Sequence, residues 1–436
     1  MHRKLGVRHL SCIALAALAL AGCGDDGGGG GAGSSEQGAT EGAKKAPTLE
    51  AAQGAKGTVT MCAGKDTSGA LTEAIKLFNK EHQAQGLKVV KNELATDATE
   101  VRNQFIQRAQ AKSDECDVLQ SDIIWTAEFA QQGWIMDLSD YANPRKGEFI
   151  PSTLSSYDFD GKLWGVPQVT GAGLLYRRTD QVKEAPATWQ ELYEQGAAND
   201  GFAYQGAPYE GLTCNFVELS SAAGGRILSE DGTKAELDSP ENLEALKLMV
   251  DGMKSGGAVK ASRTYMEEPA RIAFESGKAT FMRNWSYAYA LGKKAPKVKD
   301  KLAVSPLPPF EGGGDGGVLG GNGPVVSAFT DVPEAAILWV DFWTSEETLK
   351  RNAAKYALPP TMPQLYEEAS VVKTLPYATE LLTAVENATT RPVSPVYSQI
   401  SQAVYENVNK AVAGQRSPED ALKRGQEQIE KALSSF

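Results

Sequence analysis

Histidine is scarce in this chain of 436 residues, which contains only three. His2 and His9 lie within the first ten residues, so His82 alone remains in the rest of the chain. A Ser-His-Asp or Cys-His nucleophile system would have to use that residue. His82 follows an apolar helical stripe that begins at Leu71, and we interpret it as a structural residue at a helix end. The scarcity therefore argues against a histidine-based hydrolase.

Several enzyme and metal motifs are also missing. The chain has five cysteines but no CxxC pair, so a cysteine zinc site has little support. It has no HExxH sequence, and Gly64-Lys65 is followed by Asp66 instead of the Ser or Thr of a phosphate loop. We therefore expect neither a metal nor a cofactor. Composition alone leaves open a carboxylate pair for glycoside hydrolysis, although no spacing favours one pair.

Long apolar runs are missing except for residues 10–21, which are too few for a stable membrane-spanning helix of about 20 residues. Three basic residues precede this run: Arg3, Lys4 and Arg8. This order is typical of a secretory signal. The run ends in Leu20-Ala21-Gly22-Cys23, which matches the bacterial lipobox, whose cysteine receives a diacylglycerol. We predict a signal peptide over residues 1–22, lipidation of Cys23, and attachment to the outer face of the cytoplasmic membrane through this lipid alone.

A Gly-, Ala- and Ser-rich segment follows the lipobox over residues 24–56. Such a composition cannot bury enough apolar surface to offset its ordering entropy. We predict that residues 23–56 carry the lipid and form a flexible tether, with a root-mean-square reach of about 30 Å. Residues 57–436 exceed the usual size of one core, so two domains are expected.

Negative charge predominates along the chain. The formal net charge is −11, and it becomes −14 once the three basic residues of the signal are removed. Such a chain has no electrostatic reason to bind nucleic acid or anionic lipid. The balance excludes these partners without identifying another.

Strands and helices alternate in the first third of the folded part. Strands are predicted over residues 58–62, 87–94 and 117–124, with helices after Ser68, after Asp97 and from Thr126. This order predicts a mainly parallel sheet with helices on both faces. Later helices begin at capping residues, which are Thr188, Ser239, Ser394 and Ser417. Short strands are predicted at residues 174–176 and 320–327, where we expect the chain to cross between the domains.

Three cysteines remain if Cys12 leaves with the signal and Cys23 carries the lipid. Two of them can pair in an oxidising compartment. Cys62 and Cys116 lie in or beside two predicted neighbouring strands, so this pair is favoured. Cys214 is then expected to be a free thiol, buried as a small apolar residue.

Aromatic and polar side chains gather in predicted loops that follow strands, the usual place for ligands in α/β sheets. Sugars suit these groups, because a pyranose stacks on an aromatic ring while its hydroxyls need charged or planar partners. A buried charged acceptor also discriminates strongly against a ligand that lacks the matching hydroxyl. The residues are Lys65, Asp66, Asp122, Trp125, Trp285, Tyr287 and Arg391.

The sequence resembles the extracellular solute-binding proteins of carbohydrate ABC importers, the family that contains the maltose- and trehalose/maltose-binding proteins. The resemblance covers nearly all of residues 57–436. Its motifs are Ala63-Gly64-Lys65-Asp66-Thr67, Asp122-Ile123-Ile124-Trp125-Thr126-Ala127-Glu128-Phe129-Ala130, Gly173-Leu174-Leu175-Tyr176-Arg177-Arg178, Ala273-Phe274-Glu275-Ser276-Gly277-Lys278-Ala279, Asn284-Trp285-Ser286-Tyr287, Gly320-Gly321 and Arg391-Pro392.

The resemblance implies roles for individual residues. Trp285 and Tyr287 would stack on a glucose ring or pack around it. Asp122 and Asp66 would accept hydrogen bonds from hydroxyls, and Arg391 would donate to them. Together with the residues selected by their place after strands, the predicted ligand-binding set is Lys65, Asp66, Asp122, Trp125, Glu218, Trp285, Tyr287, Gly321, Asn322 and Arg391. Gly321 would allow close backbone approach, and Glu218 falls in a region that lines the cleft of maltose-type members.

The resemblance also implies an α/β fold with two lobes joined by hinge strands, each lobe a mainly parallel sheet flanked by helices. We expect residues 57–172 and 322–355 in the N-terminal lobe, and 173–321 and 356–436 in the other. A monomer would close on a disaccharide of the trehalose or maltose type and deliver it to a permease with associated ATPases. Val169-Thr170-Gly171 and Asn322 differ from some trehalose/maltose binders, which leaves the sugar open. An extracytoplasmic glycoside hydrolase and a receptor for another small solute remain as alternatives.

Overall fold

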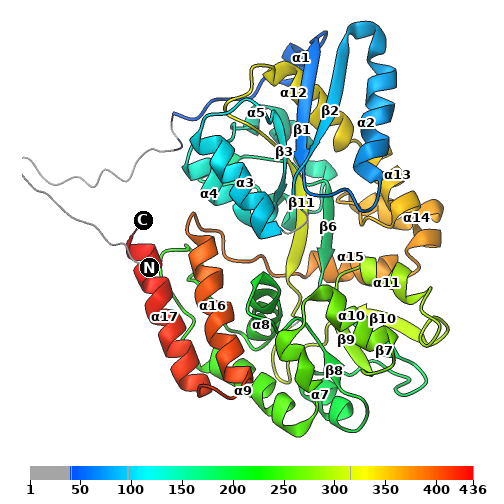
Figure 1. Cartoon of the computed structure of the whole chain (residues 1–436), viewed down its shortest axis with the longest axis vertical. Coiled ribbons are helices and arrows are strands. Elements are labelled where there is room, and N and C mark those ends of the chain that lie inside the picture. The colour runs from blue at the N-terminus through cyan, green and yellow to red at the C-terminus, as the bar shows by residue number, and fades with distance from the viewer. Residues whose placement is uncertain (1–39, 41, 96–97, 315, 436) are drawn as a thin grey trace, which may run out of the picture. The chain divides into compact units, whose positions relative to one another are not determined.

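The computed structural model describes residues 40, 42–95, 98–314 and 316–435, and Figure 1 shows their helices and strands. Residues 39–436 form one compact unit. Within the described residues the strands form two main sheets and one short hairpin of β4 (Asp158–Phe159) and β5 (Lys162–Leu163). We call the larger sheet with its helices the N lobe, and the smaller sheet with its helices the C lobe. The predicted signal peptide and Cys23 lie outside the described residues.

The N-lobe sheet has the strand order β2-β1-β3-β11-β6. Its strands are β1 (Gly57–Ala63), β2 (Leu87–Glu93), β3 (Val118–Asp122), β6 (Val169–Ala172) and β11 (Leu319–Val326). β1 pairs in parallel with both β2 and β3, as the alternating pattern predicts. β11 is antiparallel to both β3 and β6, because it enters the sheet from the C lobe.

The C-lobe sheet has the order β10-β7-β9-β8 and corrects one expectation. Its strands are β7 (Leu174–Arg178), β8 (Phe202–Ala203), β9 (Phe281–Asn284) and β10 (Leu302–Pro306). β7 is antiparallel to both β9 and β10, and only β8 and β9 run in parallel. The prediction of a mainly parallel sheet is therefore wrong for this lobe. The sequence of this half shows apolar stripes that predict helices, but it contains no signal for the direction in which the short strands run.

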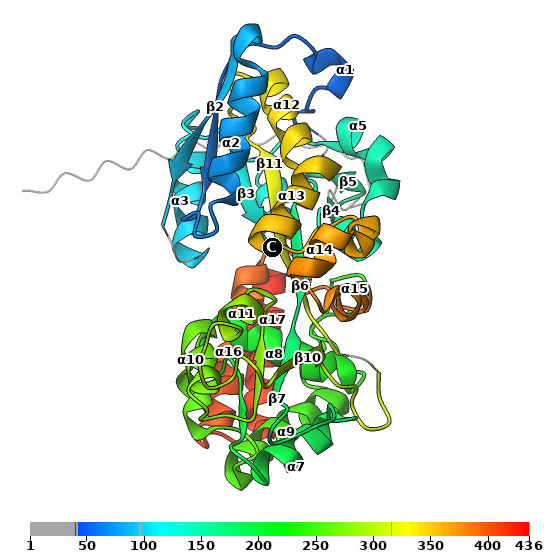
Figure 2. The same ribbon diagram turned by 90° about the vertical axis from the view of Figure 1, so that its right-hand side faces the viewer.

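Helices cover both sheets, and the two views show those of each lobe grouped around its own strands (Figures 1 and 2). The N lobe has α1 (Leu49–Ala52), α2 (Ala70–Glu81), α3 (Ala98–Gln110), α4 (Thr126–Gln131), α5 (Ser139–Ala142), α6 (Pro151–Ser155), α12 (Pro333–Trp343) and α13 (Glu346–Tyr356). The C lobe has α7 (Trp189–Ala197), α8 (Glu210–Ala222), α9 (Pro240–Ser255), α10 (Glu267–Glu275), α11 (Tyr287–Gly292), α16 (Tyr397–Val412) and α17 (Pro418–Ser434). The hydroxyls of Thr188, Ser239 and Ser417 cap α7, α9 and α17.

The predicted tether is too long, because its last part belongs to the folded body. Ala46 and Ala52 are buried in the N-lobe core. The Ala46 N–H donates to the carbonyl oxygen of Asp137 at 2.8 Å, and Thr48 caps α1. A few alanines and one leucine suffice to dock this segment against α12, which the overall composition of residues 24–56 concealed.

Within the part of the chain that the structure describes, the backbone passes between the lobes three times. It first crosses at Gly173, between β6 and β7, and it returns along β11. The third crossing lies later than the predicted exchange near Tyr356. Residues 357–367 still bind the N lobe, since the Ile150 N–H donates to Thr361 O at 2.8 Å. α14 (Ala369–Thr374) and α15 (Ala378–Glu386) then lead toward the C lobe.

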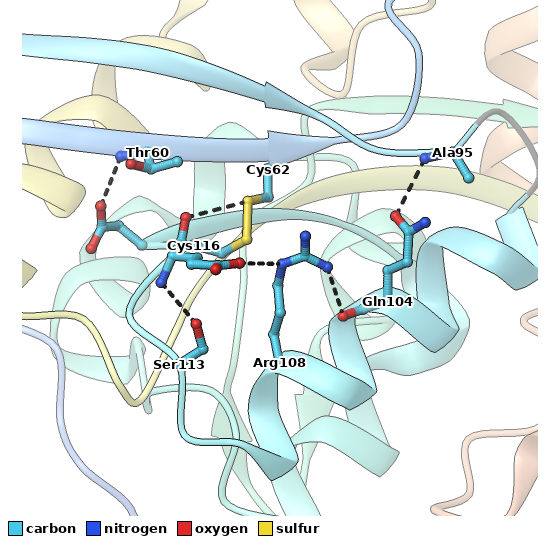
Figure 3. Close-up of a disulfide and its surroundings, with 9 residues drawn as sticks. Thr60, Cys62, Ala95, Gln104, Arg108, Ser113 and Cys116 are labelled. Carbon is cyan, nitrogen blue, oxygen red and sulfur yellow. Dashed lines mark hydrogen bonds and ion pairs between the residues drawn. A yellow bond between two sulfur atoms is a disulfide. The ribbon is translucent and has the colours of Figure 1, made fainter.

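A disulfide joins Cys62 in β1 to Cys116, which lies just before β3 (Figure 3). The two Cα atoms are 5.6 Å apart. The same junction is tied by the Thr60 N–H, which donates to Asp117 Oδ2 at 2.7 Å. Cys214 is a buried free thiol.

Candidate ligand-binding site

A cavity of about 530 Å³ lies where both lobes contribute residues. The N lobe lines it with the end of β3, with β6 and with part of β11. The C lobe contributes the start of α8, the start of α10 and the residues around the start of α11. Six predicted site residues line this cavity: Asp122, Trp285, Tyr287, Gly321, Asn322 and Arg391. A second hollow of about 500 Å³ contains only Arg391 of the predicted set.

Arg391 connects carboxylates from the two lobes. Its Nη1 donates to Oε1 of Glu210 at 2.8 Å, and its Nη2 donates to Oδ1 of Asp122 at 3.3 Å. Asp122 ends β3 in the N lobe, whereas Glu210 begins α8 in the C lobe. Arg391 is 6% exposed, and among the described residues its Nε has no hydrogen-bond partner. The arginine therefore bridges the lobes and keeps one buried donor unsatisfied.

Glu210 is held by more than Arg391. Its Oε1 also accepts a hydrogen bond from the Tyr397 hydroxyl at 2.6 Å, and its Oε2 accepts one from Ser401 Oγ. Both partners come from α16, so that helix fixes the carboxylate in place. Glu210 is consequently a rigid acceptor at the cavity wall.

Burial raises the pKa of Asp122, and the positive charge of Arg391 opposes this shift. The Asp122 side chain also caps the turn that follows β3, because its Oδ1 accepts from the Ile124 N–H at 3.1 Å.

The phenol of Tyr287 stays protonated at neutral pH. Burial is the main cause that raises its pKa, and the hydrogen bond to Glu268 adds to this effect. The site thus combines carboxylate acceptors with a neutral phenol.

Trp285 and Tyr287 form an aromatic wall at the end of β9. The backbone carbonyl of Trp285 accepts a hydrogen bond from the Tyr176 hydroxyl at 2.7 Å. The backbone N–H of Trp285 donates to Asn284 Oδ1 at 2.9 Å. The Tyr287 hydroxyl donates to Glu268 Oε1 at 2.8 Å. A side chain at Gly320 would place its Cβ 2.9 Å from Cζ3 of the Trp285 ring. The glycine therefore allows β11 to pass against the indole.

Four predicted site residues do not line the cavity. Asp66 instead caps α2, because its carboxylate accepts from the N–H groups of Gly69 and Thr72. Lys65 is exposed beside it. These positions follow a strand, as predicted, but the carboxylate is engaged by the next helix.

Trp125 is buried in the N-lobe interior, where its ring meets those of Phe105 and Phe129 edge-on and tilted. Glu218 is fully buried, and it pairs with the fully buried Arg283. Burial raises the pKa of Glu218, which Arg283 opposes. The partner of Glu218 lies 65 residues away in sequence, on a strand whose position the sequence does not reveal.

The cavity includes residues that the sequence analysis missed. They are chiefly Thr99, Tyr209, Glu210, Met266, Glu267 and Pro359. Tyr209 and Glu210 follow Pro208 at the start of a helix, where an aromatic and a polar side chain stand next to each other. Such a pair could have been selected, but its proximity to Arg391 depends on the third crossing.

The described residues contain no group of three or more His, Cys, Asp or Glu arranged to hold a metal ion. None of their helices is long and apolar enough to cross a membrane.

The sequence of this chain matches one family of known proteins. The family described as bacterial extracellular solute-binding protein matches residues 64–350, well over half of the chain. The chain belongs to this family. The resemblance inferred from the sequence is confirmed at this level, and the chain is a solute-binding protein and not an enzyme.

Individual relatives support the assignment. This solute-binding protein is 33% identical over 341 residues to a probable ABC transporter-binding protein of Deinococcus radiodurans, covering 73% of this chain and 80% of the relative. Maltose-bound MalE3 of T. maritima is 33% identical, has a TM-score of 0.78, and aligns over 86% of this chain and 99% of its own. The GacH receptor of Streptomyces glaucescens, solved unliganded and with acarbose, has a TM-score of 0.77 at 24% identity over 87% of this chain and 99% of its own, a likeness of fold alone. The two-lobed α/β fold is thereby confirmed.

Proposed function

We propose that this protein is the lipid-anchored binding component of a carbohydrate ABC importer. It captures a disaccharide of the maltose or trehalose type between its lobes and delivers it, as a monomer, to a membrane permease with associated ATPases. The observation that best supports this proposal is the cavity of about 530 Å³, whose lining combines the aromatic wall with fixed carboxylates from both lobes. Its volume falls in the range of about 300–1,000 Å³ typical of small-molecule sites.

The chemistry of the wall suits a sugar. Trp285 and Tyr287 offer apolar surface to the C–H face of a pyranose, with polar groups at their edges. Asp122 and Glu210 accept hydrogen bonds from hydroxyls, and the Arg391 Nε supplies a donor that has no other described partner. A ligand that lacks a matching hydroxyl leaves such buried groups unpaired and binds weakly. The 33% identity to a maltose-bound protein favours an α-glucoside among the possible sugars.

Binding energy drives closure in this proposal. The ligand touches Asp122 on the N lobe and Trp285 on the C lobe, so it makes its full set of contacts only when the lobes are together. It shifts the open-closed equilibrium by the difference between its affinities for the two states. The closed form is then the one that the permease receives.

The test is calorimetric titration of residues 23–436, carrying Cys23→Ser to prevent lipidation, with maltose, trehalose, sucrose and glucose. We expect saturable one-to-one binding of an intact disaccharide, with glucose weaker by at least about tenfold. Chromatography of each sugar after hours of incubation checks for hydrolysis. Absence of binding by every disaccharide would refute the α-glucoside assignment, and released glucose would favour the hydrolase alternative.

A further inference from the structure

Trp285 rests on a buried arginine that does not line the cavity. The guanidinium carbon of Arg283 lies 3.9 Å from the centre of the Trp285 ring. Arg283 is in β9, two residues before the tryptophan, and its side chain is fully buried. A planar guanidinium at this distance attracts the face of an indole, most strongly when both are shielded from water. The guanidinium of Arg283 therefore supports one face of the Trp285 ring.

Glu218 holds this arginine in place. The Arg283 Nε donates to Oε1 and Oε2 of Glu218 at 3.1 and 3.0 Å, and its Nη2 also donates to Oε1. The Nη1 donates to Gln205 Oε1 at 3.3 Å. A fully buried ion pair is weak evidence for stability, because apolar residues of similar volume would often serve as well. Its presence directly beneath a cavity residue suggests a role other than stability.

Glu218, Arg283 and Trp285 form a stack, and each of the two segments that cross between the lobes here has a glycine packed against it. A Cβ at Gly173, between β6 and β7, would lie 2.0 Å from Glu218 Oε1. A Cβ at Gly320, in β11, would lie 2.9 Å from the Trp285 ring. Glu218 and Trp285, at the two ends of the stack with Arg283, thus pack closely against the crossing segments.

We propose that Arg283, oriented by Glu218, is a positioning residue that fixes the Trp285 ring at the cavity wall. The affinity for ligand then depends on an ion pair that the ligand never touches. Without the guanidinium the indole gains rotational freedom, which binding must remove at an entropic cost. The effect on affinity rests on the proposed stacking of sugar on Trp285, whereas the fixing of the ring does not.

The first test needs no ligand and uses near-ultraviolet circular dichroism, which reports aromatic rings held in fixed surroundings. The difference spectrum between the parent and Trp285→Ala isolates the signal of this ring. The same difference is then taken in the Glu218→Gln/Arg283→Met background, which leaves no buried charge unpaired. We expect its amplitude to fall to about half or less. An unchanged difference spectrum would overturn the proposal.

The second test is a double-mutant cycle on affinity, measured with whichever of maltose, trehalose, sucrose and glucose binds most tightly to the parent. We expect the paired substitution to weaken binding at least about fivefold in the parent and less than about twofold in the Trp285→Ala background. Equal losses in both backgrounds would show that Arg283 does not act through Trp285. If Trp285→Ala leaves affinity unchanged while the dichroism changes as expected, the proposed sugar contact fails and the positioning role stands.

Two further variants guard against trivial results. Arg102→Met/Glu128→Gln removes a half-buried N-lobe ion pair that does not line the cavity, and it should leave affinity and the Trp285 signal unchanged. Arg283→Lys keeps the charge for Glu218 but loses the planar stacking group, so it replaces the paired substitution if that variant unfolds. We expect the same two effects from Arg283→Lys, and their absence in a folded protein would contradict the proposal.

Discussion

The most informative side chain of the site is Trp285, which lines the cavity, packs against Gly320 and rests on Arg283. Its residue type and place after a strand made it predictable, because an aromatic there suggests a sugar platform. The same reasoning selected Trp125, which packs into the core instead. The two cases differ only in which neighbours surround the ring, and those neighbours come from distant segments.

Replacing Trp285 by alanine should weaken sugar binding at least tenfold, or about 1.4 kcal/mol, because the sugar loses its stacking surface. Titration calorimetry measures the change. Trp134→Ala is the matched control, since Trp134 is a half-buried tryptophan of the N lobe that does not line the cavity. Unchanged affinity in Trp285→Ala would remove this residue from the binding site.

Polar site residues were less predictable than aromatic ones. Asp122 and Arg391 both reach the cavity, but their contact with one another joins residues 269 positions apart. Asp66 follows a strand equally well, yet the Ser68-Gly69 turn and Thr72 occupy its carboxylate. The capping pattern was visible in the sequence and could have explained Asp66 as a helix cap.

Elements are tied together by bonds whose effect can be measured separately. The Cys62–Cys116 disulfide links β1 to the start of β3 across 54 positions of sequence. Replacing both cysteines by serine should lower the free energy of unfolding by about 2–4 kcal/mol, since the unfolded chain is no longer cross-linked. Denaturant unfolding measures the loss. Dithiothreitol should destabilise the parent but not the double variant, and equal responses would contradict the assigned pairing.

Charge pairing also ties β7 to β10 and gives a pH dependence. Arg178, at the end of β7, and Lys301, just before β10, both donate to Asp180. The hydrogen bond from Arg178 is the main cause that lowers the pKa of Asp180 to about 2, from an ordinary value of 3.8. A lowered carboxyl pKa stabilises the fold above the ordinary value, and this contribution is lost as pH falls from about 4 to about 2.

Asp180→Asn should therefore lower the melting temperature slightly at pH 7, with a free-energy loss below about 1 kcal/mol because the pair is exposed and screened. The difference in melting temperature between Asp180→Asn and the parent should become smaller below pH 4, and thermal melts across pH 3–7 measure it. Asp238→Asn changes another exposed aspartate and serves as the control. A difference that stayed constant with pH would exclude this ion pair as its cause.

At the scale of the whole molecule, the sequence predicted an α/β fold with two lobes. The alternating strands and helices of the first third gave the parallel pairing around β1 correctly. The antiparallel C-lobe sheet and the late third crossing were missed. Both depend on how residues far apart in sequence pack, and short strands such as β8, with two residues, have no periodicity to read.

Attachment to the membrane is the remaining prediction at this scale. Cys23→Ser should abolish incorporation of radioactive palmitate in the bacterial host and move the protein from the membrane fraction to the soluble one, because a lipid chain is the only proposed anchor. Labelling and fractionation are the measurements. Cys12→Ser changes the other cysteine of the leading segment and should keep both the label and the location. Palmitate incorporation by Cys23→Ser would refute lipidation at this residue.

The position of β11 has a consequence for biosynthesis. This strand lies between β3 and β6, and among the described residues β6 pairs with no other strand of the sheet. A nascent chain can assemble β1, β2 and β3 early, but residues 319–326 must emerge before the N-lobe sheet is complete. The β3 edge of the sheet therefore stays unpaired until the residues of β11 are available. A chain made from its N-terminus must keep this edge from pairing with other strands until then.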